Sequence, residues 1–231
     1  MSTAKIDRRV DHSHHFSSMD AEHEAGKQGV WLFMATEIMM FGGLFAGYFL
    51  YRFKFHDMYI VGGDSLDWKL GALNTLVLLF SSFTMAQAVT ETMKGNNQKA
   101  IKLVITTTVC ALAFMVVKYF EYTAKIHHGL FPGFGMWNPD LEYIGSKVRD
   151  SGLMTNLDPA NLKLFFVLYF AMTGLHGIHI IIGVGLMIWL MKRLKNNEFS
   201  PKYYTAVEGV GLYWHIVDII WIFLFPLMYL I

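Results

Sequence analysis

The sequence is poor in charge and contains one cysteine. Charged residues make up 16% of its 231 residues, whereas hydrophobic residues make up 54%. A soluble domain carries about 25% charged residues, so this chain has too few to cover a globular surface, and a location in a lipid bilayer is indicated. Lys and Arg (19) nearly balance Asp and Glu (18), which argues against nucleic-acid binding. A single cysteine, Cys110, excludes an intrachain disulfide framework and a cysteine-based zinc or iron–sulfur site.

Long apolar stretches separate the few charges. A bilayer core of about 30 Å is crossed by roughly 20 apolar residues in a helix, and the chain has five stretches of this kind. The sequence therefore predicts an all-α fold, a polytopic membrane protein with a bundle of five transmembrane helices. The predicted spans are residues 29–51, 70–90, 101–122, 164–191 and 208–231. We expect one membrane domain over residues 29–231, preceded by a polar cytoplasmic tail over residues 1–28.

The connections between the spans indicate the topology. The run His12-Ser13-His14-His15 in the tail could bind a metal, but it is more typical of a mobile segment. Residues 123–163 are rich in Gly, Pro and Asn and predict a long, turn-rich loop. Eleven Lys and Arg lie on the side of the N-terminus and seven on the other side. This asymmetry predicts a cytoplasmic N-terminus and a C-terminus on the opposite, periplasmic side.

Glu37 is the one charge in the middle of the first span. An ionisable side chain inside a membrane helix is costly unless it is neutralised, paired or hydrated, and burial favours its neutral form. The neighbours Ile38, Met39, Met40 and Phe41 offer no local partner. Glu37 is therefore the candidate for a proton-linked or lipid-contacting carboxyl group. The alternative is a structural hydrogen bond to a neighbouring helix.

The last two spans hold a second group of polar side chains at helical spacing. They are Thr173, His176 and His179 in the fourth span and Glu208, His215 and Asp218 in the fifth. We interpret them as an interhelical polar network, in which His215 bonds to Asp218 or Glu208. His176 would bond to a backbone carbonyl or a lipid headgroup. Metal or haem ligation by the histidines is the alternative, although a membrane di-iron site needs more His or Glu ligands than the chain offers.

The remaining polar features predict helix packing. Asn74 and the hydroxyl residues of the second span allow membrane helices to approach and hydrogen-bond. The first span has small residues that also predict close packing against another helix, namely Gly42, Gly43, Ala46 and Gly47. Lys118 and Glu121 are three residues apart near the end of the third span and predict an ion pair there.

Five short motifs follow one another along the chain. The first three are Thr36-Glu37-Ile38-Met39-Met40-Phe41-Gly42-Gly43, then Leu73-Asn74-Thr75, then Tyr119-Phe120-Glu121-Tyr122. The fourth is Thr173-Gly174-Leu175-His176-Gly177-Ile178-His179, and the fifth is Glu208 followed by Tyr213-Trp214-His215-Ile216-Val217-Asp218-Ile219-Ile220-Trp221. In this order and spacing they resemble the third subunit of the haem–copper cytochrome c oxidases, from about Gly26 to the end of the chain.

The resemblance implies an accessory subunit of a proton-translocating oxidase in aerobic respiration. This chain would hold no haem, copper or catalytic residue, because the redox centres belong to the catalytic subunit I and to the copper-bearing subunit II. It would pack on subunit I, hold phospholipid, and support proton uptake and turnover stability, with a larger respiratory supercomplex as a further partner. Longer family members have two more N-terminal helices, one arm of a lipid-filled cleft. The short form implies a multi-pass protein of a bacterial inner (plasma) membrane.

Three alternatives to this interpretation are open. The first is the third subunit of a quinol oxidase or of a related terminal reductase, although that branch tends to have Asp where this chain has Glu37. The second is an intramembrane metalloenzyme using His176, His179 and His215. The third is a small transporter, which would be expected to show inverted repeats or interrupted helices.

Overall fold

The computed structural model describes residues 19–149, 151–156, 158–200 and 203–230, and the predicted histidine run at residues 12–15 lies outside them. Over the described residues the chain is mainly helical, with one isolated antiparallel bridge between Ser200 and Tyr203. The elements are α1 (Met19–Lys54), α2 (His56–Asp64), α3 (Trp68–Met93), α4 (Asn97–His127), α5 (Leu141–Lys147), the 3-10 turn η1 (Ser151–Asn156), α6 (Pro159–Lys195) and α7 (Thr205–Tyr229).

Five helices of the described part, namely α1, α3, α4, α6 and α7, are long and apolar enough to cross a bilayer. The predicted all-α, five-helix membrane fold is therefore confirmed. The helices extend beyond the apolar stretches, and α1 begins at Met19, inside the predicted polar tail. Its 36 residues reach about 54 Å at 1.5 Å per residue, so the apolar stretch marks only the part within the bilayer.

Short helices occupy the connections at one end of the bundle. The structure adds α2, which no apolar stretch predicts, and α5 and η1 divide the predicted loop at residues 123–163. The turn between α4 and α5 requires Gly129, because its φ is 67° and an added Cβ would lie 1.9 Å from the backbone oxygen of Asn138. Asp158 begins α6 by accepting a hydrogen bond from the backbone N–H of Ala160 at 2.9 Å.

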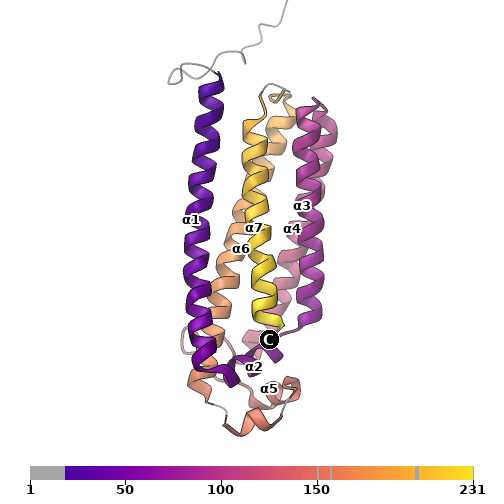
Figure 1. The fold of residues 1–231 in the computed structure, drawn as a ribbon. Helices are drawn as coiled ribbons and strands as arrows, with labels where there is room; N and C mark the ends of the chain where they lie inside the picture. The colour runs from indigo at the N-terminus through magenta and orange to yellow at the C-terminus, as the bar shows by residue number, and fades with distance from the viewer. Residues whose placement is uncertain (1–18, 150, 157, 201–202, 231) are drawn as a thin grey trace, which may run out of the picture.

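The membrane helices form a packed core with α7 in its middle and α1 at its side (Figure 1). Helices α3 and α4 form an antiparallel hairpin, and α7 packs against α3, α6 and α1. In the most apolar 18-residue stretch of α7, 56% is buried inside the protein. In the corresponding stretch of α1, only 6% is buried. Most of the apolar surface of α1 is therefore left for lipid or for another protein. The end of the bundle that holds α2 and α5 also holds the C-terminus (Figure 1).

Candidate functional site

Glu37 meets His179 at the contact between α1 and α6. The Oε2 atom of Glu37 lies 2.8 Å from Nε2 of His179, and both side chains are mostly buried. The sequence correctly shows no partner among the chain neighbours of Glu37, but the tertiary structure supplies one from a residue 142 positions later. Glu37 lies 18 residues after the start of α1, or about 27 Å along its axis. The pair is therefore deep within the membrane span.

One ring nitrogen of His179 is oriented by the backbone of α6. Its Nδ1 atom lies 2.7 Å from the carbonyl oxygen of Leu175, which can only accept a hydrogen bond, so Nδ1 carries a hydrogen. The Tyr213 hydroxyl donates to the backbone oxygen of His179 at 2.9 Å and fixes this turn of α6 against α7.

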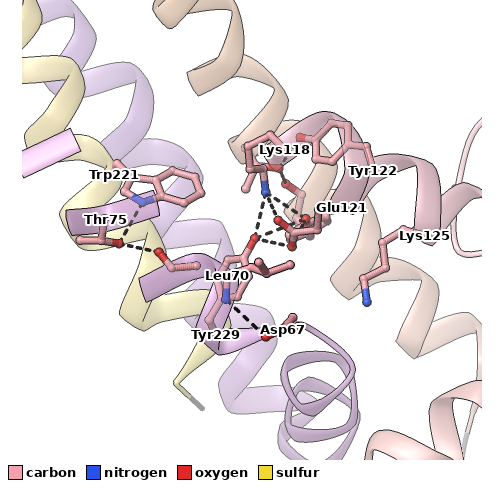
Figure 2. A network of polar contacts seen from close by, with 12 residues as sticks. Asp67, Leu70, Thr75, Lys118, Glu121, Tyr122, Lys125, Trp221 and Tyr229 are labelled. Atoms are coloured by element: carbon pink, nitrogen blue, oxygen red, sulfur yellow. Dashed lines mark hydrogen bonds and ion pairs between the residues drawn. The ribbon is translucent and has the colours of Figure 1, made fainter. Parts of the chain in front are cut away.

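Lys118 and Glu121 form the ion pair that their spacing predicts, with Nζ 2.9 Å from Oε2. The Nζ atom also donates to the hydroxyls of Tyr229 at 2.9 Å and Tyr169 at 3.1 Å. Both hydroxyls in turn donate to Oε1 of Glu121, at 2.6 Å from Tyr229 and 2.9 Å from Tyr169. Figure 2 shows how this cluster joins α4 to the end of α7. Every donor of the ammonium group is used, so the cluster is a closed link between α4, α6 and α7.

Aromatic rings complete the surroundings of this buried ammonium group. Four rings have centroids between 5.1 and 5.6 Å from the Nζ atom of Lys118, and they belong to Tyr122, Tyr169, Trp221 and Tyr229. Ring faces attract cations, most strongly where water is excluded. On α6, the Thr173 hydroxyl donates to the backbone oxygen of Tyr169 at 2.6 Å and contacts the Tyr122 hydroxyl of α4 at 2.5 Å. Thr173 therefore extends the link between α4 and α6.

The three polar residues of α7 do not bond to one another, contrary to the prediction. His215 contacts the Ser82 hydroxyl on α3 at 2.7 Å, and Glu208 lies 3.8 Å from Nζ of Lys27 on α1. Both carboxyl oxygens of Asp218 are buried without a hydrogen-bond partner among the described residues. Helical spacing places residues on one side of α7, but α7 is central, so each turn faces a different neighbour.

His176 is fully buried on α6, and the predicted bond to a backbone carbonyl is absent among the described residues. Neither ring nitrogen has a hydrogen-bond partner among the described residues. The imidazole is enclosed by the rings of Phe114 and Trp221, with centroids at 5.6 and 5.1 Å. Asn74 is buried on α3 and belongs to neither the Glu37 pair nor the Lys118 cluster.

The glycines of α1 make no close contact with another helix of the described chain. A Cβ atom added at Gly42, Gly43 or Gly47 would meet no atom of the described chain within 4 Å. Helix α1 instead buries Phe41 and Tyr48 against the bundle. This contact leaves a groove of about 790 Å³ between α1 and the α6–α7 pair. Its lining includes Val30, Phe33, Leu186, Trp189, Ala206 and Val210.

The sequence model of the cytochrome c oxidase subunit III family matches residues 12–129 and 162–231. The chain belongs to this family. It is 29% identical over 224 residues to the cytochrome c oxidase subunit 3 of Thermostichus vulcanus, covering 96% of this chain and 92% of that one. It is 26% identical over 227 residues to the quinol oxidase subunit 3 of Bacillus spizizenii, with 96% and 97% covered. It is also 27% identical over 211 residues to the heme-copper oxidase subunit I+III of Aeropyrum pernix, covering 89% of this chain and 22% of that longer one.

Membership of the subunit III family makes the chain a multi-pass membrane protein and part of a haem–copper oxidase complex. Among its described residues, no group of three or more His, Cys, Asp and Glu side chains could hold a metal ion. Two hydroxyl groups of α3 accept hydrogen bonds from tryptophan N–H groups of α7, and neither pairing is predicted from the sequence. Trp214 donates to Ser81 at 3.0 Å, and Trp221 donates to Thr75 at 3.1 Å (Figure 2). A buried Trp N–H needs an acceptor, but the sequence does not identify which residue supplies it.

Proposed function

We propose that this chain is the non-redox accessory subunit of a bacterial cytochrome c oxidase, and that its Glu37–His179 pair exchanges a proton to support proton uptake by the oxidase. The observation that carries the proposal is the 2.8 Å contact between the two side chains on separate helices. The pair joins α6 to α1, the helix with the least buried apolar surface. A proton can therefore reach the pair from the side of a partner subunit or of a lipid headgroup.

The partners are the catalytic haem–copper subunit I and the copper-bearing subunit II, which hold the redox centres. The fused subunit I+III relative supports the first of these contacts, because the two subunits form one polypeptide there. The open glycine face of α1, at Gly42, Gly43 and Gly47, supports a contact with another membrane helix, since small residues let helix backbones approach closely. A larger respiratory supercomplex is a further assembly that this role allows.

The groove between α1 and the α6–α7 pair is proposed to hold phospholipid acyl chains. Its lining is apolar, and its volume of about 790 Å³ is within the range of ligand sites. A lipid in this position would support α1 where the chain itself leaves it uncovered. This arrangement connects lipid holding to turnover stability, because loss of the lipid would free the helix that carries Glu37.

The experiment that tests the proton role compares Glu37→Gln with Glu37→Ala in the assembled oxidase. Gln keeps the shape and the hydrogen-bonding capacity of Glu but cannot titrate. Oxygen consumption is followed against time and pH. We expect a modest loss of initial rate, largest at high pH where protons are scarce, and a larger loss of the time for which turnover lasts. Identical rates and lifetimes in the parent and both variants would remove Glu37 from the proposal.

The location is proposed to be a bacterial inner membrane, with a cytoplasmic N-terminus and a periplasmic C-terminus. Cysteine labelling in a variant without Cys110 tests the orientation. Gln98→Cys and Asn138→Cys are suitable sites because both residues are exposed, whereas the adjacent Asn97 is buried against Phe199. We expect labelling of residue 138 only from the periplasmic side. Periplasmic labelling of residue 98 would reverse the orientation.

A quinol oxidase subunit III is the second candidate, favoured by the similarity of 26% over nearly the full length of the Bacillus spizizenii protein. The two candidates differ in the electron donor, which other subunits bind. Purification of the assembled complex distinguishes them, because a copper-bearing subunit II that accepts electrons from cytochrome c should accompany this chain. A complex that lacks that copper centre and oxidises quinol would select the second candidate.

A further inference from the structure

A polar pocket of about 430 Å³ lies at the end of the bundle that holds α2 and α5. It is formed where α3 begins, α4 ends and α5 covers the bundle. The pocket is separate from the Glu37–His179 pair and from the apolar groove beside α1. The charged residues of its lining are Asp64, Asp67, Lys69, Glu121, Lys125 and Lys147. Tyr143 also lines the pocket, beside Lys125 and Lys147.

The three acidic groups of this pocket are already engaged. Asp64 accepts hydrogen bonds from the backbone N–H and the Nε of Arg149, at 3.1 and 2.6 Å. Asp67 is the N-cap of α3 and accepts from the backbone N–H groups of Lys69 and Leu70, at 3.0 and 3.3 Å. Glu121 is neutralised by Lys118. None of these carboxylates forms an ion pair with a lysine of the pocket lining.

The lysines of the pocket have no such partners. Lys125 is 3% exposed, and its Nζ donates to the backbone oxygen of Ser65 and to the Tyr143 hydroxyl, the latter at 3.3 Å. Figure 2 shows its ammonium group pointing away from the cluster around Lys118. No carboxylate of the described chain lies within ion-pair distance of Lys69, Lys125 or Lys147. A buried charge without a counterion is costly, so an anion here would stabilise the fold.

Two of the ammonium groups converge on one ring. The Nζ atoms of Lys125 and Lys147 lie 5.3 and 5.9 Å from the ring centroid of Tyr143. Like charges in such proximity repel one another unless an anion lies between or beside them. The lining also includes Lys69, so three lysines share it with three carboxylates, of which Asp64 and Glu121 pair with Arg149 and Lys118 outside the lining. Asp67 is then the one carboxylate of the lining without an ion pair in the described chain, against three lysines.

We propose that this pocket binds a phosphate group, in the form of an anionic phospholipid headgroup. The apolar residues at its mouth favour a lipid over a free phosphate ion. Trp68, Leu70 and Phe120 line the pocket and are exposed, and Trp is typical of the membrane–water interface. The exposed apolar surfaces of α3 and α4 continue from there into the membrane span, at Leu73 and Val116. Acyl chains of a lipid whose phosphate contacts Lys125 and Lys147 would lie along this surface.

Lipid binding by the purified full chain tests the proposal without depending on turnover. The probes are phosphatidylglycerol, phosphatidylcholine and inorganic phosphate, with bound molecules counted by native mass spectrometry. Lys147→Gln and Lys69→Gln change exposed side chains and should fold normally, whereas Lys125→Gln changes a buried one. Lys102→Gln is the matched control, because Lys102 is an exposed lysine of the same α4 at the opposite end of the bundle.

We expect the parent to retain about one phosphatidylglycerol in preference to phosphatidylcholine. Each lysine removed from the pocket should weaken this binding about fivefold, the contribution of one basic residue near an anionic lipid surface, and Lys102→Gln should leave it unchanged. If inorganic phosphate binds and Lys147→Gln weakens that binding, while phosphatidylglycerol and phosphatidylcholine bind equally, the phosphate site is supported and its ligand is free phosphate. Equal binding of both lipids in parent and variants, without phosphate binding, would overturn the proposal.

Discussion

The two buried ion pairs of this subunit differ in how completely their surroundings satisfy them. Around Lys118 and Glu121, two tyrosine hydroxyls use the remaining donors and acceptors, and three helices are joined. Glu37 and His179 meet at a single contact on a helix that is mostly uncovered. In a closed cluster the protons stay in place, because every donor of the ammonium group already has a partner inside the cluster. The pair on α1 is therefore the less completely satisfied of the two, in agreement with the proton role proposed for it.

The largest expected effect is the loss of the closed cluster. Lys118→Gln or Glu121→Gln leaves one buried charge uncompensated, which typically costs about 3–5 kcal/mol. Reversible unfolding of the purified chain in mixed detergent micelles measures this change. The double variant Lys118→Gln and Glu121→Gln should recover part of the loss. Two single variants that each cost less than about 1 kcal/mol, the range of exposed pairs, would show that the cluster is not closed.

Removal of His179 should have a smaller effect on stability. In His179→Gln, Glu37 loses its one contact to α6, so we expect a loss of about 1–2 kcal/mol, the range for one buried polar contact. The same unfolding experiment measures it. In the assembled oxidase, this variant should leave the haem spectrum unchanged. A lost or shifted haem band would instead support the metalloenzyme alternative with His179 as a ligand.

His176 tests the opposite case, a buried polar group without any partner. Replacement by an apolar residue of similar size, His176→Leu, removes two unpaired nitrogens and should change the free energy of unfolding by less than about 1 kcal/mol. His176→Ala is the control, because the cavity it leaves should cost about 2–4 kcal/mol. If the Leu variant is as unstable as the Ala variant, His176 has a partner that contacts within the described chain do not supply.

The smallest effect is expected outside the membrane, at the start of α5. The backbone N–H of Tyr143 and the side chain of His128 hold the pKa of Asp140 below its ordinary value, with both contacts at 3.0 Å. A lowered pKa in the folded state stabilises the loop above the unfolded value of about 3.9, and this contribution disappears as pH falls through the folded pKa. Hydrogen exchange at the Tyr143 amide should therefore reveal easier opening below about pH 4. Asp140→Asn keeps a capping side chain and should lose that pH dependence.

The interior polar contacts show where sequence reasoning succeeds and where it fails. Lys118 and Glu121 are on one helix, so their pairing follows from helical spacing alone. The partners of His215 and Glu208 are on α3 and α1, and spacing along α7 cannot show which neighbour each turn faces. His176, which has no hydrogen-bond partner among the described residues, differs from expectation for the same reason, since its contacts depend on what other helices place nearby.

The sequence by itself determined the all-α membrane fold, because five apolar stretches have no other way to satisfy their backbone groups in lipid. Its motifs also predicted the subunit III family, which the family match confirms. Only the tertiary structure decided that Glu37 meets His179, that α1 stays largely uncovered, and that the three lysines of one pocket form no ion pair within the described residues. These features join residues far apart in the chain, and their geometry depends on the packing of whole helices.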